Sequence, residues 1–91
     1  MKNTYIAAGT ATTVCHANAC VLKRIVINNA GAGGNTLTVY DNASAGSGTI
    51  IAVIDTVELN GRVLEYDIRC QNGVTVVSAT GTGADLSVVT Y

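Results

Sequence analysis

Charged side chains are scarce in this sequence: they make up 12% of the 91 residues, whereas a typical soluble domain contains about 25%. The net charge is −1, and Lys23-Arg24 is the only basic pair. Proteins that bind nucleic acid neutralise its phosphates with clustered Lys and Arg. The composition therefore argues against nucleic acid as a partner.

Long apolar runs are also missing. A transmembrane helix needs about 20 consecutive apolar residues, and the sequence contains no such run. The segment that follows Lys2 has no apolar stretch of signal-peptide length. We therefore expect no membrane partner, and synthesis in a cytoplasm that the protein leaves only by cell lysis or as part of a particle.

Proline, phenylalanine and tryptophan are absent, and no segment shows a helical period of apolar residues. What is present is a chain that is 48% hydrophobic, with mainly Val, Ile, Ala and Leu mixed with many Thr. β-Branched side chains lose rotamer freedom in a helix and pack well on a pleated sheet. The chain therefore predicts one all-β domain that spans residues 1–91.

Turn signals divide the sequence at short intervals, which is typical of a β-sandwich or a barrel. The Asn72-Gly73 pair in QNG (71–73) is the usual signal of a two-residue hairpin turn. We predict an antiparallel β-sandwich, jelly-roll-like, with seven or eight short strands, and keep a small β-barrel as the alternative. The expected strands cover residues 10–15, 21–28, 36–40, 49–55, 62–70, 74–79 and 85–91, with a short extended piece at 5–8.

Two of these segments lack the alternation of apolar and polar residues that a half-exposed antiparallel strand shows. VLKRIVIN (21–28) alternates poorly, and TIIAVID (49–55) is apolar on both faces, with Ile50 and Ile54 on one and Val53 on the other. A chain of this size has no layer of helices to cover both faces. We therefore expect a second copy of the same chain to cover one of them.

The alternating segments assign some side chains to the core and others to the contact between copies. The expected core consists of Ile25, Ile27, Leu37, Val39, Leu64, Tyr66, Ile68, Leu86 and Val88. The expected oligomer interface consists of Val26, Tyr40, Val77, Val89 and Tyr91. Tyrosine is enriched at protein interfaces, which favours this assignment over an exposed tyrosine platform for a sugar.

The segment CHANAC (15–20) holds the only histidine between two of the three cysteines. Structural zinc sites take paired Cys or His ligands, and the sequence has no second close pair. A Cys–His nucleophile needs side chains that point at each other, whereas neighbours on a strand point to opposite faces. A disulfide between Cys15 and Cys20 is kept as an alternative, although cysteines remain thiols by default in a chain without a secretion signal. The favoured interpretation is small buried side chains beside a turn, and Cys70 fits it too.

Two glycine-rich loops match phosphate-binding motifs only in part. GAGGNT (31–36) lacks the third glycine of a dinucleotide fingerprint, and a strand follows where a helix N-terminus is required. TGTG (80–83) fails in the same way. The carboxylates show no pairing typical of acid–base catalysis, and DNASAGSG (41–48) has too few ligands for calcium. We therefore predict no catalytic residue, no metal, no cofactor and no enzyme activity.

Three strings carry a family resemblance: LTVYDN (37–42), NGVTVV (72–77) and TGTGADLSVV (80–89). Over about residues 20–91 the chain resembles the short all-β proteins found among head-decoration (cement) and head-fibre components of tailed phages. CHANAC lies outside the resemblance, which rests on structural segments and on no catalytic motif.

The resemblance implies a structural virion protein, made in the host cytoplasm and located on the capsid surface. It implies a homotrimer that binds the phage major capsid protein and stabilises the shell without chemistry. The alternative is a ligand- or carbohydrate-binding β-sandwich module of a phage tail or fibre. That alternative predicts Tyr40 or Tyr91 in a groove rather than in a subunit contact.

Overall fold

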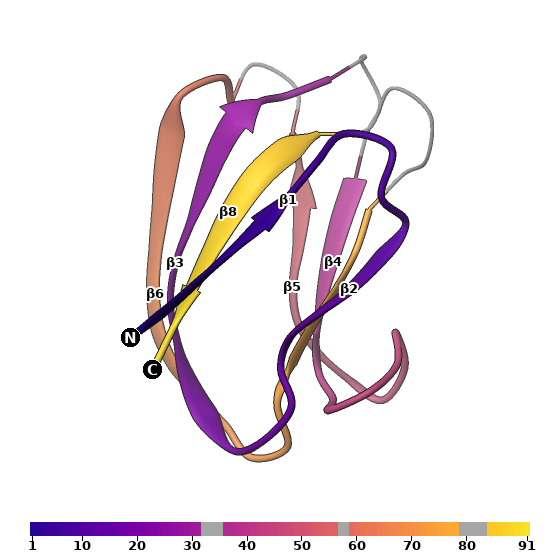
Figure 1. Ribbon diagram of the computed structural model, residues 1–91, viewed down its shortest axis with the longest axis vertical. Coiled ribbons are helices and arrows are strands. Elements are labelled where there is room, and N and C mark those ends of the chain that lie inside the picture. Colours follow the sequence, from indigo (N-terminus) through magenta and orange to yellow (C-terminus); the bar gives the residue numbers. More distant parts are fainter. Residues whose placement is uncertain (32–35, 57–58, 79–83) are drawn as a thin grey trace.

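The computed structural model describes residues 1–31, 36–56, 59–78 and 84–91, which form eight strands and no helix (Figure 1). The strands are β1 (Lys2–Ile6), β2 (Thr12–His16), β3 (Cys20–Asn29), β4 (Thr36–Asp41), β5 (Thr49–Asp55), β6 (Arg62–Cys70), β7 (Val74–Val77) and β8 (Asp85–Thr90). Every strand expected from the sequence overlaps one of them. Nothing in these ranges is a helix of the length and apolarity needed to cross a membrane.

The strands form two antiparallel four-stranded sheets, as Figure 1 shows. Sheet A has the order β1-β8-β3-β6, and sheet B has the order β2-β7-β4-β5. Only β4 and β5 are neighbours both in sequence and within a sheet, because every other connection passes from one sheet to the other. This is the strand order of a double-sheet jelly roll. The predicted β-sandwich is confirmed, and the described strands do not close into the alternative barrel.

The inner faces of the two sheets form one apolar core, as the alternating segments predict. Six of the nine expected core side chains are fully buried: Ile25, Ile27, Leu37, Val39, Leu86 and Val88. The other three, Leu64, Tyr66 and Ile68, pack against this core but stay partly exposed, because β6 is an edge strand. The core also contains buried side chains that the sequence analysis left unassigned, including Ile6, Leu22, Ile54, Val74 and Val76.

A β-bulge explains why VLKRIVIN alternates poorly. The register of β3 with both of its neighbours shifts between Leu22 and Arg24. Leu22 and Ile25 are fully buried, while Lys23 and Arg24 between them are both partly exposed. Opposite Lys23, Asp67 has a φ of 65°, the left-handed region that Asp adopts more readily than most residues. The broken alternation therefore reflects a bulge and needs no second covering layer.

A second bulge changes which residues of TIIAVID share a face. The register of β5 with β4 shifts at Ile51, which is the extra residue. Ile50 turns outward with Val53, and the two residues are 54% and 62% exposed, whereas Ile54 is buried. The prediction that Ile50 and Ile54 lie on one face is wrong, because the bulge reverses the alternation between them.

The predicted hairpin at residues 71–73 is also wrong. β6 lies in sheet A and β7 in sheet B, so this segment connects the two sheets. Gly73 is required by a close approach, since a Cβ there would collide with the carbonyl oxygen of His16. Of the predicted glycine-rich loops, residues 32–35 and 80–83 lie outside the described residues.

Candidate functional site

The strand register defines an uncharged surface on the outer face of sheet B. It consists of two rows of cross-strand neighbours: Thr12, Val77, Thr38 and Val53, and beside them Val14, Thr75, Tyr40 and Ile50. We call these eight residues the sheet B face. Val14, Ile50 and Val53 are 39%, 54% and 62% exposed. Exposed large apolar side chains of this kind on one face are typical of an interaction surface.

The loop between β4 and β5 packs over the middle of the sheet B face. The Thr75 hydroxyl donates a hydrogen bond to the carbonyl oxygen of Asn42 at 2.8 Å, and Thr75 is fully buried. A Cβ at Gly46 would collide with a methyl group of Val77 and would lie 3.6 Å from the Tyr40 ring. The exposed apolar side chains are therefore left at the two edges of the face, with Val14 on β2 and the others on β5.

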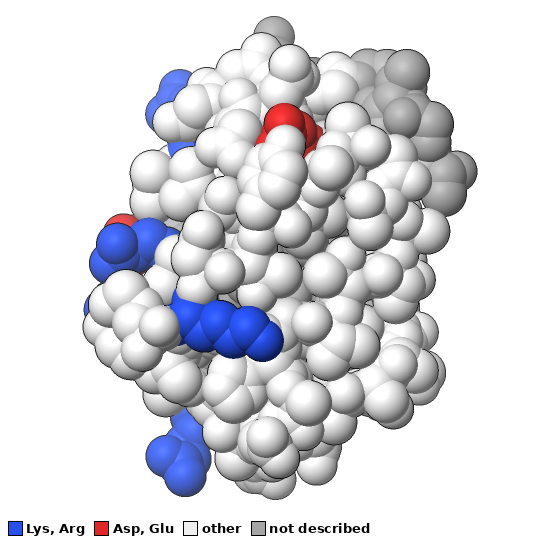
Figure 2. Space-filling model, viewed as in Figure 1, with Lys and Arg blue, Asp and Glu red and all other residues white. Residues whose placement is uncertain are grey.

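The outer face of sheet A is charged. All five Lys and Arg residues lie on strands of this sheet, and three of them, Lys23, Arg24 and Arg69, lie on its outer face. The other two, Lys2 and Arg62, lie at strand ends opposite the buried Thr90 and Ile27. Two ion pairs cross from β3 to β6, Lys23 with Asp67 at 2.7 Å and Arg24 with Glu65 at 3.4 Å. Figure 2 shows the visible basic side chains over β1, β3 and β6, while the visible surface over β2 is free of charge.

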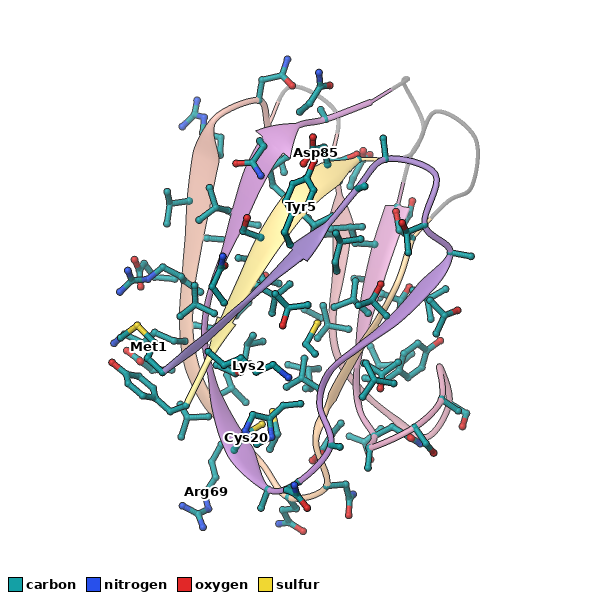
Figure 3. All side chains as sticks on the ribbon, viewed as in Figure 1. Met1, Lys2, Tyr5, Cys20, Arg69 and Asp85 are labelled. Atoms are coloured by element: carbon teal, nitrogen blue, oxygen red, sulfur yellow. The ribbon has the colours of Figure 1, made fainter. Side chains whose placement is uncertain are left out.

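The N-terminal strand is also tied to sheet A by a polar contact on the outer face. The Tyr5 hydroxyl donates a hydrogen bond to the Asp85 carboxylate at 2.8 Å, and the two side chains point toward one another in Figure 3. This bond raises the pKa of Tyr5, because the neutral phenol is the hydrogen-bond donor. This bond and the two ion pairs join polar side chains of neighbouring strands on sheet A.

The structure does not bring the five predicted interface residues together. Tyr40 and Val77 belong to the sheet B face, but Val26 and Val89 lie on the outer side of sheet A. Tyr91 follows β8 and exchanges two backbone hydrogen bonds with Val21, also in sheet A. The sequence analysis missed Val14, Ile50 and Val53. The uncharged run between residues 49 and 54 signals this surface, but the bulge decides which of its side chains point outward.

Asp41 ties the end of β4 to the connection between β6 and β7. Its carboxylate accepts hydrogen bonds from the backbone N–H groups of Gln71, Asn72 and Gly73 at 3.0, 2.8 and 3.3 Å. These bonds, chiefly the one from Gln71, lower the pKa of Asp41 because they favour its charged form. The role of Asp41 is therefore structural: it holds the crossover that replaces the predicted hairpin.

The three cysteines are free thiols and all are buried. Cys20 and Cys70 are directly opposite each other in the β3–β6 pair, whereas Cys15 lies on β2 in sheet B. Burial raises the pKa of Cys15 and of Cys70 to about 11, and it also raises the pKa of Cys20. The pair that the sequence left open, Cys15 with Cys20, is unbonded. The register instead places Cys20 against Cys70, a pairing that spacing in the sequence could not reveal.

The single histidine, His16, accepts a hydrogen bond within the turn between β2 and β3. The backbone N–H of Asn18 donates a hydrogen bond to Nδ1 of His16 at 3.3 Å. Among the residues the structure describes, no three His, Cys, Asp or Glu side chains converge as metal ligands. The same ranges contain no pocket.

Comparison of the chain with protein-family models, curated proteins and solved structures gave no match.

Proposed function

We propose that the protein is a structural component of a bacteriophage particle, a capsid decoration (cement) protein. In this proposal it binds the major capsid protein on the surface of the shell as a homotrimer and stabilises the shell. The observation that carries the proposal is the sheet B face, an uncharged surface with exposed Val14, Ile50 and Val53. Such a face is better covered by protein than by water.

The phage context rests on the sequence resemblance, and the fold supports it. Double-sheet jelly rolls of eight strands are a common architecture of viral capsid proteins and of lectins. The fold alone does not assign a function, so the properties of the surface must distinguish a capsid protein from a lectin. An uncharged face with exposed apolar side chains, and without a pocket in the described ranges, favours contact with protein over capture of a small sugar.

The arrangement of the exposed side chains supports a ring of three copies. A cyclic trimer uses a heterologous contact, in which each copy presents two different patches. The β4–β5 loop divides the exposed part of the sheet B face into two such patches, Val14 on β2 and Ile50 with Val53 on β5. We place the Val14 patch of one copy against the β5 patch of the next.

The first test is the solution mass of the purified protein by light scattering coupled to size exclusion. We expect three times the 9.3 kDa mass of one chain, maintained across a dilution series. A monomer at all concentrations would contradict the trimer. A monomer would favour the alternative function, a ligand- or carbohydrate-binding module, and binding to a glycan array would then test that alternative.

Matched variants locate the contact. Val53→Lys places a charge in the proposed contact and should dissociate the trimer. Val63→Lys makes the same change at a residue that is 51% exposed on β6, outside the sheet B face, and should leave the mass unchanged. Equal effects of the two substitutions would overturn the assignment of the contact to sheet B.

A charge swap tests the heterologous geometry. In the double variant Val14→Asp with Val53→Lys, opposite charges meet across each contact between copies, so association should partly return. The two positions lie on opposite edge strands of sheet B, so the charges cannot pair within one chain. If the double variant is as monomeric as Val53→Lys, the copies do not meet in this head-to-tail way.

Binding to the shell needs a separate assay. The wild-type protein should cosediment with empty heads of the phage that encodes it and raise the temperature at which those heads break open. If the trimer neither cosediments with the heads nor changes their stability, the proposed oligomer stands and the proposed decoration role is wrong.

A further inference from the structure

We propose that Cys20 and Cys70 form an oxidative modification site, at which a disulfide joins β3 to β6 when the protein meets a peroxide. The site is independent of the proposed function, because it lies within one subunit. It also differs from the Cys15–Cys20 pair that the sequence spacing suggested.

The strand register carries the inference. Cys20 and Cys70 are direct partners in the antiparallel β3–β6 pair, at the ends of both strands. Direct partners in an antiparallel pair have Cα atoms about 4.5–5.5 Å apart, which falls within the roughly 4.4–6.8 Å span of a disulfide. Each of the two thiols also influences the pKa of the other, which agrees with side chains that lie near one another. No movement of the backbone between sheets is needed.

The third cysteine is less well placed for either partner. Cys15 lies in the other sheet, and its thiol contacts the carbonyl oxygen of Thr13 on its own strand at 4.0 Å. A bond from Cys15 to Cys20 would have to cross from sheet B to sheet A. The register therefore favours the Cys20–Cys70 bond over either bond to Cys15.

The two thiols differ in access, which sets the order of the steps. Cys20 is 7% exposed near the lower end of the sandwich in Figure 3, while Cys70 is fully buried. The Cys20 sulfur attacks one oxygen of hydrogen peroxide, the O–O bond breaks, and the thiol proton leaves with the other oxygen as water. Cys70 then attacks the sulfur of the Cys20 sulfenic acid, and a second water leaves. Two thiols are oxidised by two electrons, and one peroxide is reduced to two waters.

The bond would close the chain between residues 20 and 70 and pin an edge strand to the middle of sheet A. Closing a long loop lowers the entropy of the unfolded chain, so the oxidised protein should unfold at a temperature higher by about 10 °C or more. A reductant should reverse the shift. In a reducing cytoplasm the thiols persist, and the bond forms only after release into an oxidising medium.

The test is peptide mapping of the wild-type protein after hydrogen peroxide treatment, without reductant. Trypsin cleaves after Lys23 and Arg69, so Cys15 and Cys20 share the peptide 3–23, while Cys70 begins the peptide 70–91. We expect these two peptides to be joined, in a protein that remains a single chain on a non-reducing gel. A loop confined to peptide 3–23 would overturn the proposal in favour of the Cys15–Cys20 bond.

Three variants complete the test, because the joined peptides alone do not separate Cys20 from Cys15. Cys15→Ser should still give the joined peptides and the reversible rise in unfolding temperature. Cys20→Ser and Cys70→Ser should each lose both. Joined peptides that vanish in Cys15→Ser, or that persist in Cys20→Ser, would reject the site. Untreated samples of each variant, checked by circular dichroism, show that the fold is intact before oxidation.

Discussion

Sheets A and B each contain four antiparallel strands, and each contributes fully buried side chains to the core, such as Ile25 and Leu37. Their outer faces differ. The outer face of sheet A carries Lys23, Arg24 and Arg69, and two ion pairs there join β3 to β6. The eight residues of the sheet B face include no charged side chain.

The edge strands β5 and β6 repeat this contrast. β6 alternates charged and apolar residues from Leu64 to Cys70, whereas β5 has no charge between residues 49 and 54. Charged edges discourage a strand from pairing with another chain. The comparison teaches that protection against association is concentrated in one half of the sandwich, which leaves the other half free to make contacts.

The largest effects are expected for core substitutions, which test whether the inner faces of the two sheets contribute equally to stability. Ile25→Ala in sheet A and Leu37→Ala in sheet B each create a cavity in the shared core. Each should lower the free energy of unfolding by about 2–5 kcal/mol, measured by urea denaturation. A loss below about 1 kcal/mol for one of them would show that its sheet packs loosely against the other.

The next test compares tyrosines on the two outer faces. Tyr40 packs beneath the β4–β5 loop, so Tyr40→Ala should destabilise the subunit by about 1–2 kcal/mol. Tyr91 is 51% exposed at the end of sheet A, and Tyr91→Ala should change stability by less than about 0.5 kcal/mol. Tyr91→Ala should also leave the oligomer mass unchanged, and a lower mass would place the contact on sheet A.

Asp41 provides a smaller effect with a defined pH dependence. The pKa of Asp41 is lowered in the folded state, so its carboxylate stabilises the fold at pH values above the ordinary Asp pKa of 3.8, and this stability is lost as pH falls through the folded pKa. At neutral pH, Asp41→Asn should lower the unfolding temperature by about 4 °C, since it replaces the charged acceptor of three backbone hydrogen bonds at a partly buried position. The difference from wild type should shrink below pH 3.8. A constant difference at every pH would mean that the charge has no part in it.

The smallest effect is expected at the Lys23–Asp67 ion pair, where the Asp67 side chain is 63% exposed. Exposed pairs contribute little, and salt screens them. Lys23→Met should therefore cause only a slight fall in the unfolding temperature, and about 1 M sodium chloride should remove the difference. A large fall that salt does not change would show that Lys23 acts through the packing of the bulge.

The sequence predicted the strands and most of the core because each depends on local alternation. Leu37, Val39 and Leu86 were placed correctly by their position on alternating segments. The strand order was predicted only as a general jelly roll, because the pairing of β1 with β8 leaves no local signal.

The candidate surface was predicted less well, and the bulges explain why. One extra residue reverses the alternation, so Ile50 lies on the outer face and not on the face of Ile54, with which it was predicted to lie. Val26 and Tyr40 both appeared to face away from the core, but the sequence could not show that they lie on different sheets. The pairing of Cys20 with Cys70 was hidden for the same reason, since it joins segments that are far apart in the chain.

The position of β8 between β1 and β3 has a consequence for folding kinetics. Seven strands must emerge from the ribosome before the one that joins β1 to the rest of sheet A is made. Contacts between such distant segments make β-sandwiches fold slowly, on the scale of milliseconds to seconds. We therefore expect a nascent chain that lacks residues 85–90 to remain unfolded, with its unpaired strands accessible to chaperones.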